Sequence, residues 1–363
     1  MQKVLITEAS YKDCRRAIEL ALSTFPLPVR GRRVLVKVNA MTGTEPEQGT
    51  ITHPSVLRAL VALLEEMGPA EILVGDNPGG GYYGRNRDVF ADSGLLEASG
   101  GHYCNFGRVA RAVPFNPEFV ERVFPSSVVL DSDIYISVPK FKTHTKAGVS
   151  IGLKNNFGIL PGAQKANLHH RARKPVDFGR MLMEVYRLRP PDLIIVDAIL
   201  SLHTLGPYSP DLYYTGLIMA SDNGVALDAT AARMMGYDPA EVPIIRAAHD
   251  GGLGSLCEED IQVLGNLQRI PGFKIPPVED LTTPQLMKLV GRMAELPHYR
   301  PRLDAAKCDG CSLCADGCPA GALAMADGLP RLEASVCVPC FCCKEVCPRE
   351  AIEMLKPDSV VGI

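Results

Sequence analysis

Three neighbouring stretches decide the fold: RVLVKVN at residues 33–39, PSVLRALVALLEEM at residues 54–67 and AEILVGD at residues 70–76. The first and third are short and mostly apolar, as strands of a sheet covered on both faces are. The middle stretch repeats apolar residues at the spacing of one helix face, and Gly68 follows it as a stop signal. A strand, a helix and a second strand predict a parallel β–α–β unit.

The same alternation continues through residues 1–265. We expect further strands at 134–138 and 193–198 and further helices at 10–25, 177–188 and 222–235. The pattern predicts a large α/β domain with a mostly parallel sheet and helices on both faces. In such sheets, ligands bind in loops at the carboxyl ends of the strands.

Two segments follow this predicted domain. Residues 266–301 contain repeated prolines and one helical stretch at 284–296, so we interpret them as a linker. Residues 302–358 carry most of the cysteines and are predicted to form a separate small α+β domain.

The overall composition excludes several classes of protein. The chain of 363 residues has 38 Lys and Arg against 41 Asp and Glu, a formal charge of −3, which argues against a nucleic-acid binder. No run of apolar residues is long enough to span a membrane, and residues 1–10 lack an export signal, so we expect a cytoplasmic location. In that reducing compartment, the 12 cysteines favour metal ligation over disulfides.

Eight of the cysteines form two identical runs of the form C-x2-C-x2-C-x3-C-P. In runs of this kind, the first three cysteines hold one [4Fe–4S] cluster and the fourth holds the other. We therefore predict two clusters, whose ligand sets are Cys308, Cys311, Cys314 and Cys347, and Cys337, Cys340, Cys343 and Cys318. Zinc sites rarely need two such runs. The segment resembles a bacterial-type ferredoxin domain, and the extra Cys342 is interpreted as a small buried residue.

The large domain has one electrostatic anomaly. No acidic residue stands between Asp133 and Asp177, whereas this stretch holds many basic residues: Lys140, Lys142, His144, Lys146, Lys154, Lys165, His169, His170, Arg171, Arg173 and Lys174. A solvated basic face is the ordinary interpretation of such a run. Because the lysines follow a predicted buried strand and alternate with glycines, we favour a Lys/His-rich loop that binds an anion.

Two other segments are candidates of lower specificity. A glycine loop at residues 75–82 follows a predicted strand and could cradle phosphate, or be an ordinary flexible loop. Asp222 and Asp228 lie at the start of a predicted helix, where Ser221 or Asp222 could simply cap it. Alternatively, Asp222 or Asp228 faces the basic loop as a general base or as a lysine partner.

These residues also carry a resemblance to a known family. PKFKTH at residues 139–144 and LKNNFG at residues 153–158 resemble motifs of the family named domain of unknown function 362, as do shorter stretches across residues 30–255. The resemblance implies a site but no particular reaction. Together with the basic stretch, it assigns catalytic roles to Lys140, Lys142, His144, Lys154, His169 and Asp228. Substrate-binding roles fall to Asn39, Asp76, Asn155, Lys165 and Asp222.

The combined sequence features favour an iron–sulfur oxidoreductase that exchanges electrons with an anionic small molecule and with a redox protein partner. Lysines would hold the substrate, and a histidine would move protons because its pKa lies near neutrality. Three alternatives stay open at this point. The chain could be a non-catalytic electron-transfer protein, a redox helper in the maturation of a cofactor or of another protein, or a ligand sensor whose clusters report redox state.

Overall fold

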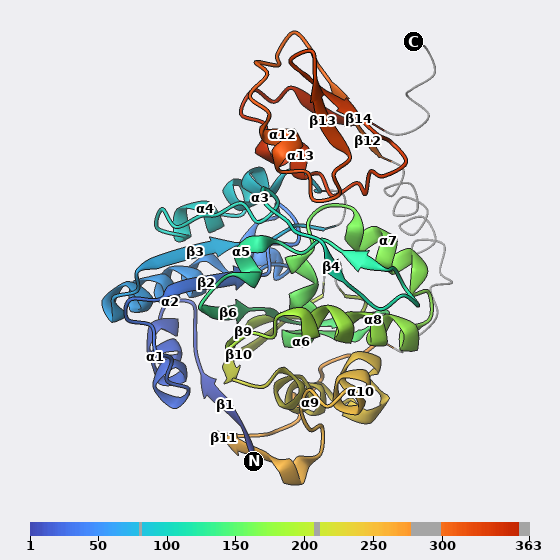
Figure 1. Ribbon diagram of the computed structural model, residues 1–363. Helices are drawn as coiled ribbons and strands as arrows, with labels where there is room; N and C mark the ends of the chain where they lie inside the picture. Colours follow the sequence, from blue (N-terminus) through green and yellow to red (C-terminus); the bar gives the residue numbers. More distant parts are fainter. Residues whose placement is uncertain (80–81, 207–210, 277–298, 356–363) are drawn as a thin grey trace.

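The computed structural model describes residues 1–79, 82–206, 211–276 and 299–355 (Figure 1). A large α/β unit is built around one sheet, and a small C-terminal unit lies above it in the view of Figure 1. The strands of the large sheet are β1 (Gln2–Glu8), β2 (Arg33–Val38), β3 (Glu71–Gly75), β6 (Ile134–Val138), β7 (Lys140–His144), β8 (Gly148–Ser150), β9 (Leu193–Leu202), β10 (Leu212–Ser221) and β11 (Ile261–Leu264).

The sheet is mostly parallel in its centre. Its strand order is β11-β1-β10-β9-β6-β2-β3, and β7 branches from β9 and pairs with β8. The strand β2 runs parallel to both β3 and β6, and β6 runs parallel to β9. In contrast, β10 is antiparallel to β9 and to β1. The predicted mixed α/β class with a mostly parallel sheet is therefore confirmed for the large unit.

Helices cover both faces of this sheet (Figure 1). The α-helices of the large unit are α1 (Cys14–Thr24), α2 (Pro54–Met67), α3 (Asn86–Asp92), α4 (Leu95–Ala98), α5 (Ser127–Leu130), α6 (Gly152–Asn155), α7 (Gln164–Arg171), α8 (Pro175–Leu188), α9 (Gly224–Met235) and α10 (Pro243–Asp250). Short 3-10 helices are η1 (Pro46–Gln48), η2 (Asn156–Ile159), η3 (Pro239–Glu241) and η4 (Glu258–Asp260), and β4 (Val113–Pro114) pairs with β5 (Arg122–Val123).

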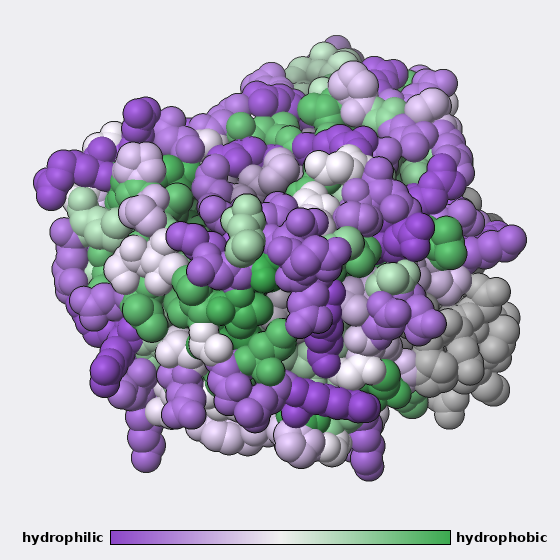
Figure 2. Space-filling model, turned by 90° about the horizontal axis from the view of Figure 1, so that it is seen from below, coloured by the Kyte–Doolittle hydropathy of each residue, from purple (hydrophilic) through white to green (hydrophobic). Residues whose placement is uncertain are grey.

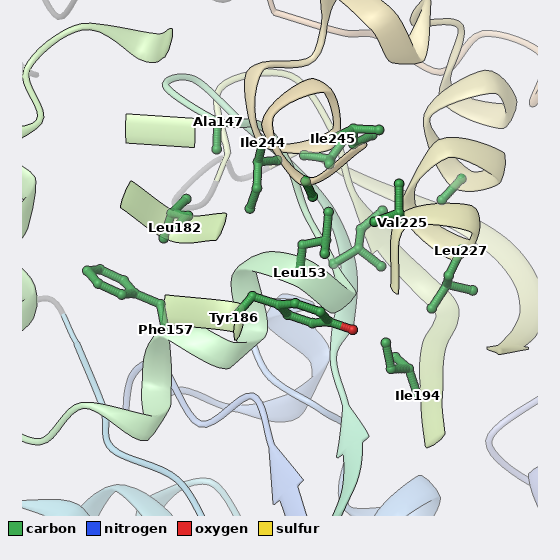
Figure 3. Close-up of a cluster of buried hydrophobic side chains, with 14 of the residues drawn as sticks. Ala147, Leu153, Phe157, Leu182, Tyr186, Ile194, Val225, Leu227, Ile244 and Ile245 are labelled. Atoms are coloured by element: carbon green, nitrogen blue, oxygen red, sulfur yellow. The ribbon is translucent and has the colours of Figure 1, made fainter. Parts of the chain in front are cut away.

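The two-residue period of the strands divides the core in two. On β2, Val34 and Val36 pack with α1 and α2, whereas Leu35 packs into the cluster on the opposite face. That second cluster is closed by α6, α8, α9 and α10, and Figure 3 shows Leu153, Tyr186 and Ile245 meeting within it.

The surface of the molecule seen from below is a mosaic of polar and apolar side chains (Figure 2).

Several predicted helices agree closely with the structure. The helix predicted at residues 54–67 is confirmed as α2, and the one predicted at 177–188 begins slightly earlier, at Pro175. The helix predicted from residue 222 begins at Gly224, because Asn223 caps it by accepting hydrogen bonds from the backbone N–H groups of Val225 and Ala226. The predicted linker helix at 284–296 lies outside the described residues.

The C-terminal unit repeats itself with an offset of 29 residues. Its elements are β12 (Arg300–Leu303), α12 (Leu313–Asp316), β13 (Leu323–Ala326), β14 (Leu329–Leu332), α13 (Cys342–Val346) and β15 (Ile352–Leu355). The starting residues recur as 300 and 329, 313 and 342, and 323 and 352. The strands pair across the repeat, β12 with β15 and β13 with β14. The backbone repeats in detail, since Ser312 and Phe341 both have φ near +60°.

None of the described helices combines the length and the apolar character needed to cross a membrane.

Candidate functional site

Three polar side chains of β7, those of Lys140, Lys142 and His144, are buried. The pairing of β7 with β9 is irregular between Lys140 and Lys142. The prediction of a loop is wrong for this segment, because β7 pairs with β8 and β9. A strand can hold buried lysines here because side-chain and backbone oxygens accept hydrogen bonds from the ammonium groups.

Two of the site's lysines are neutralised by buried aspartates. The Lys140 ammonium lies 2.8 Å from Asp197 Oδ2 and donates to the Tyr11 hydroxyl at 2.7 Å. The Lys37 ammonium lies 2.7 Å from Asp76 Oδ1. Burial lowers the pKa of both lysines, whereas the aspartates act in the opposite direction. These pairs leave little net charge for a ligand, so their function is structural support of the site.

Lys142 has no carboxylate partner within the described residues. Its ammonium donates to Asn39 Oδ1 at 2.6 Å and to the carbonyl of Thr50 at 2.8 Å. Burial first, and then the nearby positive charge of Lys154, place its pKa well below the usual 10.5. Asn39, predicted to bind substrate, therefore holds this lysine in the structure.

Lys154 differs from every other lysine of the site. Its side chain is only half-buried, and among the described residues no hydrogen bond or ion pair engages its ammonium. Burial, and then repulsion by Lys37, lower its pKa from 10.5 to about 8. The helix α6 that carries it begins where Asp228 accepts hydrogen bonds from the backbone N–H groups of Gly152 and Leu153, at 2.9 and 3.1 Å. A partly buried cation without a partner costs free energy, and an anion bound beside it would offset that cost.

Two histidines lie next to these lysines. His144 Nδ1 accepts backbone N–H groups of Lys146 and Ala147, both at 3.1 Å, so its proton resides on Nε2. His169 packs against Phe178 and Phe157. Burial, and then the charges of neighbouring lysines, hold both pKa values well below 6.5. Both rings are therefore neutral at pH 7, and His144 presents an N–H donor.

Lys165 closes the site toward the glycine loop. From the first turn of α7, its ammonium donates to the backbone carbonyls of Asn77 and Pro78, at 2.7 and 2.8 Å. Burial lowers its pKa to about 7. Asn155 links two strands next to the site. Its side-chain NH₂ donates to Ser137 Oγ on β6 at 2.9 Å, and its Oδ1 accepts from Lys37 on β2 at 3.3 Å.

The predicted basic stretch thus divides into interior and surface residues. Lys140, Lys142, Lys146 and Lys165 are buried, whereas Arg171, Arg173 and Lys174 are exposed. We name the set that contains Lys142, His144, Lys154 and His169 the lysine–histidine site. It combines two lysines that lack a carboxylate partner in the described part of the chain with two neutral histidines.

The cysteines of the C-terminal unit surround two small cavities. The cysteines that line the first are Cys308, Cys311, Cys314 and Cys347, and those that line the second are Cys318, Cys337, Cys340 and Cys343. This grouping matches the two ligand sets expected from the spacing, here named set A and set B. Within the described part of the chain, no three Cys, His, Asp or Glu side chains are placed to ligate one single metal ion.

Comparisons with known proteins address the large unit. The family described as "Domain of unknown function (DUF362)" matches residues 34–233. The chain belongs to this family. It is 32% identical over 241 residues to "Thylakoid-associated protein sll1697" of Synechocystis sp., covering 63% of this chain and 71% of that protein.

Two solved structures resemble the DUF362 chain at low similarity. One is a protein of Thermotoga maritima, with a TM-score of 0.38 and 14% identity over 60% of this chain. The other is the lactate racemase apoprotein of Thermoanaerobacterium thermosaccharolyticum, with a TM-score of 0.40 and 11% identity over 66% of this chain. The chain covers 57% and 58% of those two proteins.

The fold separates one predicted residue from the lysine–histidine site. Asp222 is exposed and follows β10, whose antiparallel direction brings its last residue, Ser221, opposite Ile194 near the amino end of β9. It lines a hollow with Met1 and Lys3 instead. Asp228 is buried, and its carboxylate is engaged by the two N–H groups of α6, so it positions Lys154.

Three residues of the site were absent from the predicted set. Lys37 could have been found, because a lysine inside an otherwise apolar strand is itself a signal. Tyr11 lies 129 positions from Lys140 in the sequence, and nothing local links the two residues. Asn77 donates from its side chain to the carbonyl of Gly158 at 2.8 Å, and it was not singled out because it stands in a glycine-rich loop.

Proposed function

We propose that this protein is an iron–sulfur oxidoreductase that binds two [4Fe–4S] clusters and exchanges electrons with an anionic substrate in the lysine–histidine site. The observation that carries the anionic substrate is the unpaired Lys154 ammonium beside Lys142 and two neutral histidines. A partly buried cation without a partner is costly, and an anionic ligand would supply the opposite charge.

The chemistry of the cysteine sets fits the clusters. Each set brings four thiols around one cavity, and soft thiolates are the ligands that iron–sulfur clusters require. Equivalent backbone groups also donate to sulfur in each half: Ala322 N–H to Cys318 Sγ at 3.2 Å, and Ala351 N–H to Cys347 Sγ at 3.3 Å. Clusters bound there would supply electrons one at a time.

The lysine–histidine site suits binding and proton transfer. Lys154 and Lys142 would bind the anionic group, and His144 would donate a hydrogen bond from Nε2. With a pKa of about 8, Lys154 can also release and regain a proton near neutral pH. This assigns proton transfer to Lys154 rather than to the histidines, whose low pKa values keep them uncharged.

In the reductive direction, the substrate takes up two electrons and two protons. The electrons come from a one-electron redox protein, which is oxidised once for each electron it supplies. The protons come from Lys154 and from water that enters the site. The reverse direction returns the same electrons and protons to the carrier and to solvent.

The test uses anaerobically purified full-length protein. We expect about eight iron and eight sulfide per chain, as two [4Fe–4S] clusters require. After reduction with dithionite, absorbance should report reoxidation by one class of anionic compound, and Lys154→Met should abolish it with iron content unchanged. Lys174→Met, a change at an exposed lysine of the same basic stretch, is the matched control and should keep the full rate.

Two outcomes would contradict the proposal. Iron and sulfide contents far below these amounts would show that the two clusters are not bound. Full loading with no reoxidation by any compound, or with equal rates in Lys154→Met, would favour the electron-carrier or maturation alternative, and a pull-down for a client protein would follow.

A further inference from the structure

We infer that electrons reach the lysine–histidine site from a cluster in set B, and that a cluster in set A receives them from a redox protein in solution. This inference rests on the proposed function, because it requires clusters in both sets. It concerns which residues of this chain connect the two units, and its test does not depend on a substrate.

A short segment of the large unit, residues 162–165, lies directly against set B and is here named the strap. The backbone N–H of Ala163 donates to the carbonyl of Pro339 at 3.0 Å. Gly162 has a φ of +61°, and a Cβ atom at this position would overlap the carbonyl of Cys340. The strap therefore touches the peptide of a set B cysteine, and only glycine permits this approach.

The same strap leads into the lysine–histidine site within three residues. Lys165 follows Gly162 and Ala163 on the first turn of α7, and its ammonium holds the carbonyls of Asn77 and Pro78. Its positive charge is one of those that lower the pKa of His169. Set B and the site are thus joined by one continuous, buried segment, residues 162–165.

Further contacts fix the C-terminal unit in this position. In the sequence, Glu345 stands between Cys343 of set B and Cys347 of set A. Its carboxylate accepts hydrogen bonds from Asn105 Nδ2 at 2.7 Å and from the backbone N–H of Asn86 at 3.2 Å. Asn86 in turn donates to Asn77 Oδ1 at 3.0 Å. Phe341 packs against Tyr83, at 6.0 Å between ring centroids, in a small apolar cluster with Ala163.

Set A is more open to solvent than set B. Cys311 of set A is the one exposed cysteine among the eight, and set A has one buried cysteine, Cys314, whereas set B has two, Cys340 and Cys343. A redox protein in solution can therefore approach set A most closely. Each electron would leave the donor, oxidising it by one electron, and pass from set A to set B, where the strap meets the site.

The experiment is a redox titration of the anaerobic full-length protein, followed by electron paramagnetic resonance. Cys311→Ala and Cys340→Ala each remove a ligand, and the signal that each variant loses identifies set A and set B. Lys165→Met is then compared with Lys307→Met, which removes an exposed lysine adjacent to Cys308. Since reduction adds negative charge, losing a nearby cation should make the potential more negative.

We expect Lys165→Met to shift the set B signal alone and Lys307→Met to shift the set A signal alone. Adding sulfate to the wild-type protein supplies a measurement that needs no variant, and it should also shift only the set B signal. A shift confined to set A, equal shifts of both signals, or no shift with either Lys165→Met or sulfate would overturn the inference. Failure of the proposed function would instead show as missing clusters or as the absence of any reactive anionic compound.

Discussion

Replacing Lys154 with methionine should stabilise the protein while it destroys the anion site. The ammonium has no partner in the described residues, and its pKa falls from 10.5 to about 8. At about 1.36 kcal/mol per pKa unit, keeping the charged lysine in the folded state costs up to ~3.4 kcal/mol at pH 7. Because the side chain is half-buried, solvent screens part of this cost, and we expect Lys154→Met to gain about 1–2 kcal/mol.

The assay is thermal unfolding of the anaerobic full-length protein, followed by circular dichroism at one scan rate and with iron content matched. A gain of this size should raise the unfolding temperature by about 2–4 °C per kcal/mol. The pH dependence has a defined sign. The folded-state pKa is lowered, so the cost is fully present below pH 8 and fades as the pH rises toward 10.5. The difference between variant and wild type should therefore shrink over that window.

Lys140→Met is the matched control, because it leaves the buried carboxylate of Asp197 without its cation. Removing one partner of a buried ion pair costs about 3–5 kcal/mol, so this variant should unfold at a lower temperature than wild type. If Lys154→Met were also destabilised at pH 7, Lys154 would have a stabilising partner in the folded protein. The argument for an anion in the site would then fail.

Three further predictions follow from the same contacts. Asp197→Asn leaves Lys140 buried without its carboxylate, so the free energy of unfolding should fall by about 3–5 kcal/mol; an unchanged urea midpoint would contradict this. Sulfate, whose charge is constant near neutrality, should bind more weakly as the pH rises through about 8 and Lys154 loses its proton; calorimetry showing equal affinity at pH 7 and 9.5 would count against Lys154 as the ligand. Cys342 is buried and lines neither cavity, so Cys342→Ala should retain full iron content, whereas Cys340→Ala should lose about half of it.

Local patterns were enough to predict much of the large unit. Apolar spacing gave α2 its full length, and short apolar runs gave β2, β3 and β6. No strand was predicted at residues 212–221, so the antiparallel course of β10 was not expected and Asp222 was assigned to the wrong end of the sheet. Residues 140–144 were predicted as a loop because they follow the predicted strand at 134–138 and glycines come after them. The strand β7 instead depends on partners distant in sequence.

The residues of the candidate site show the same division. Lys142, His144 and Lys154 were found because they stand in one stretch without acidic residues. Tyr11 and Asp197 belong to the Lys140 network through tertiary contacts alone, and Asn86 and Asn105 reach Glu345 across more than 200 positions. The duplicated cysteine spacing predicted which thiols share a cavity, because the fourth cysteine of each run lines the cavity of the other run.

The most direct test of the account is a crystal structure of the anaerobic protein soaked with selenate, with anomalous maps at the iron and selenium edges. The account predicts iron among Cys308, Cys311, Cys314 and Cys347, iron among Cys318, Cys337, Cys340 and Cys343, and selenate in contact with Lys154. Iron in both cysteine sets with selenate confined to surface arginines such as Arg171 and Arg173 would contradict the anion site. Absence of iron from the cysteine sets would contradict the proposed electron path.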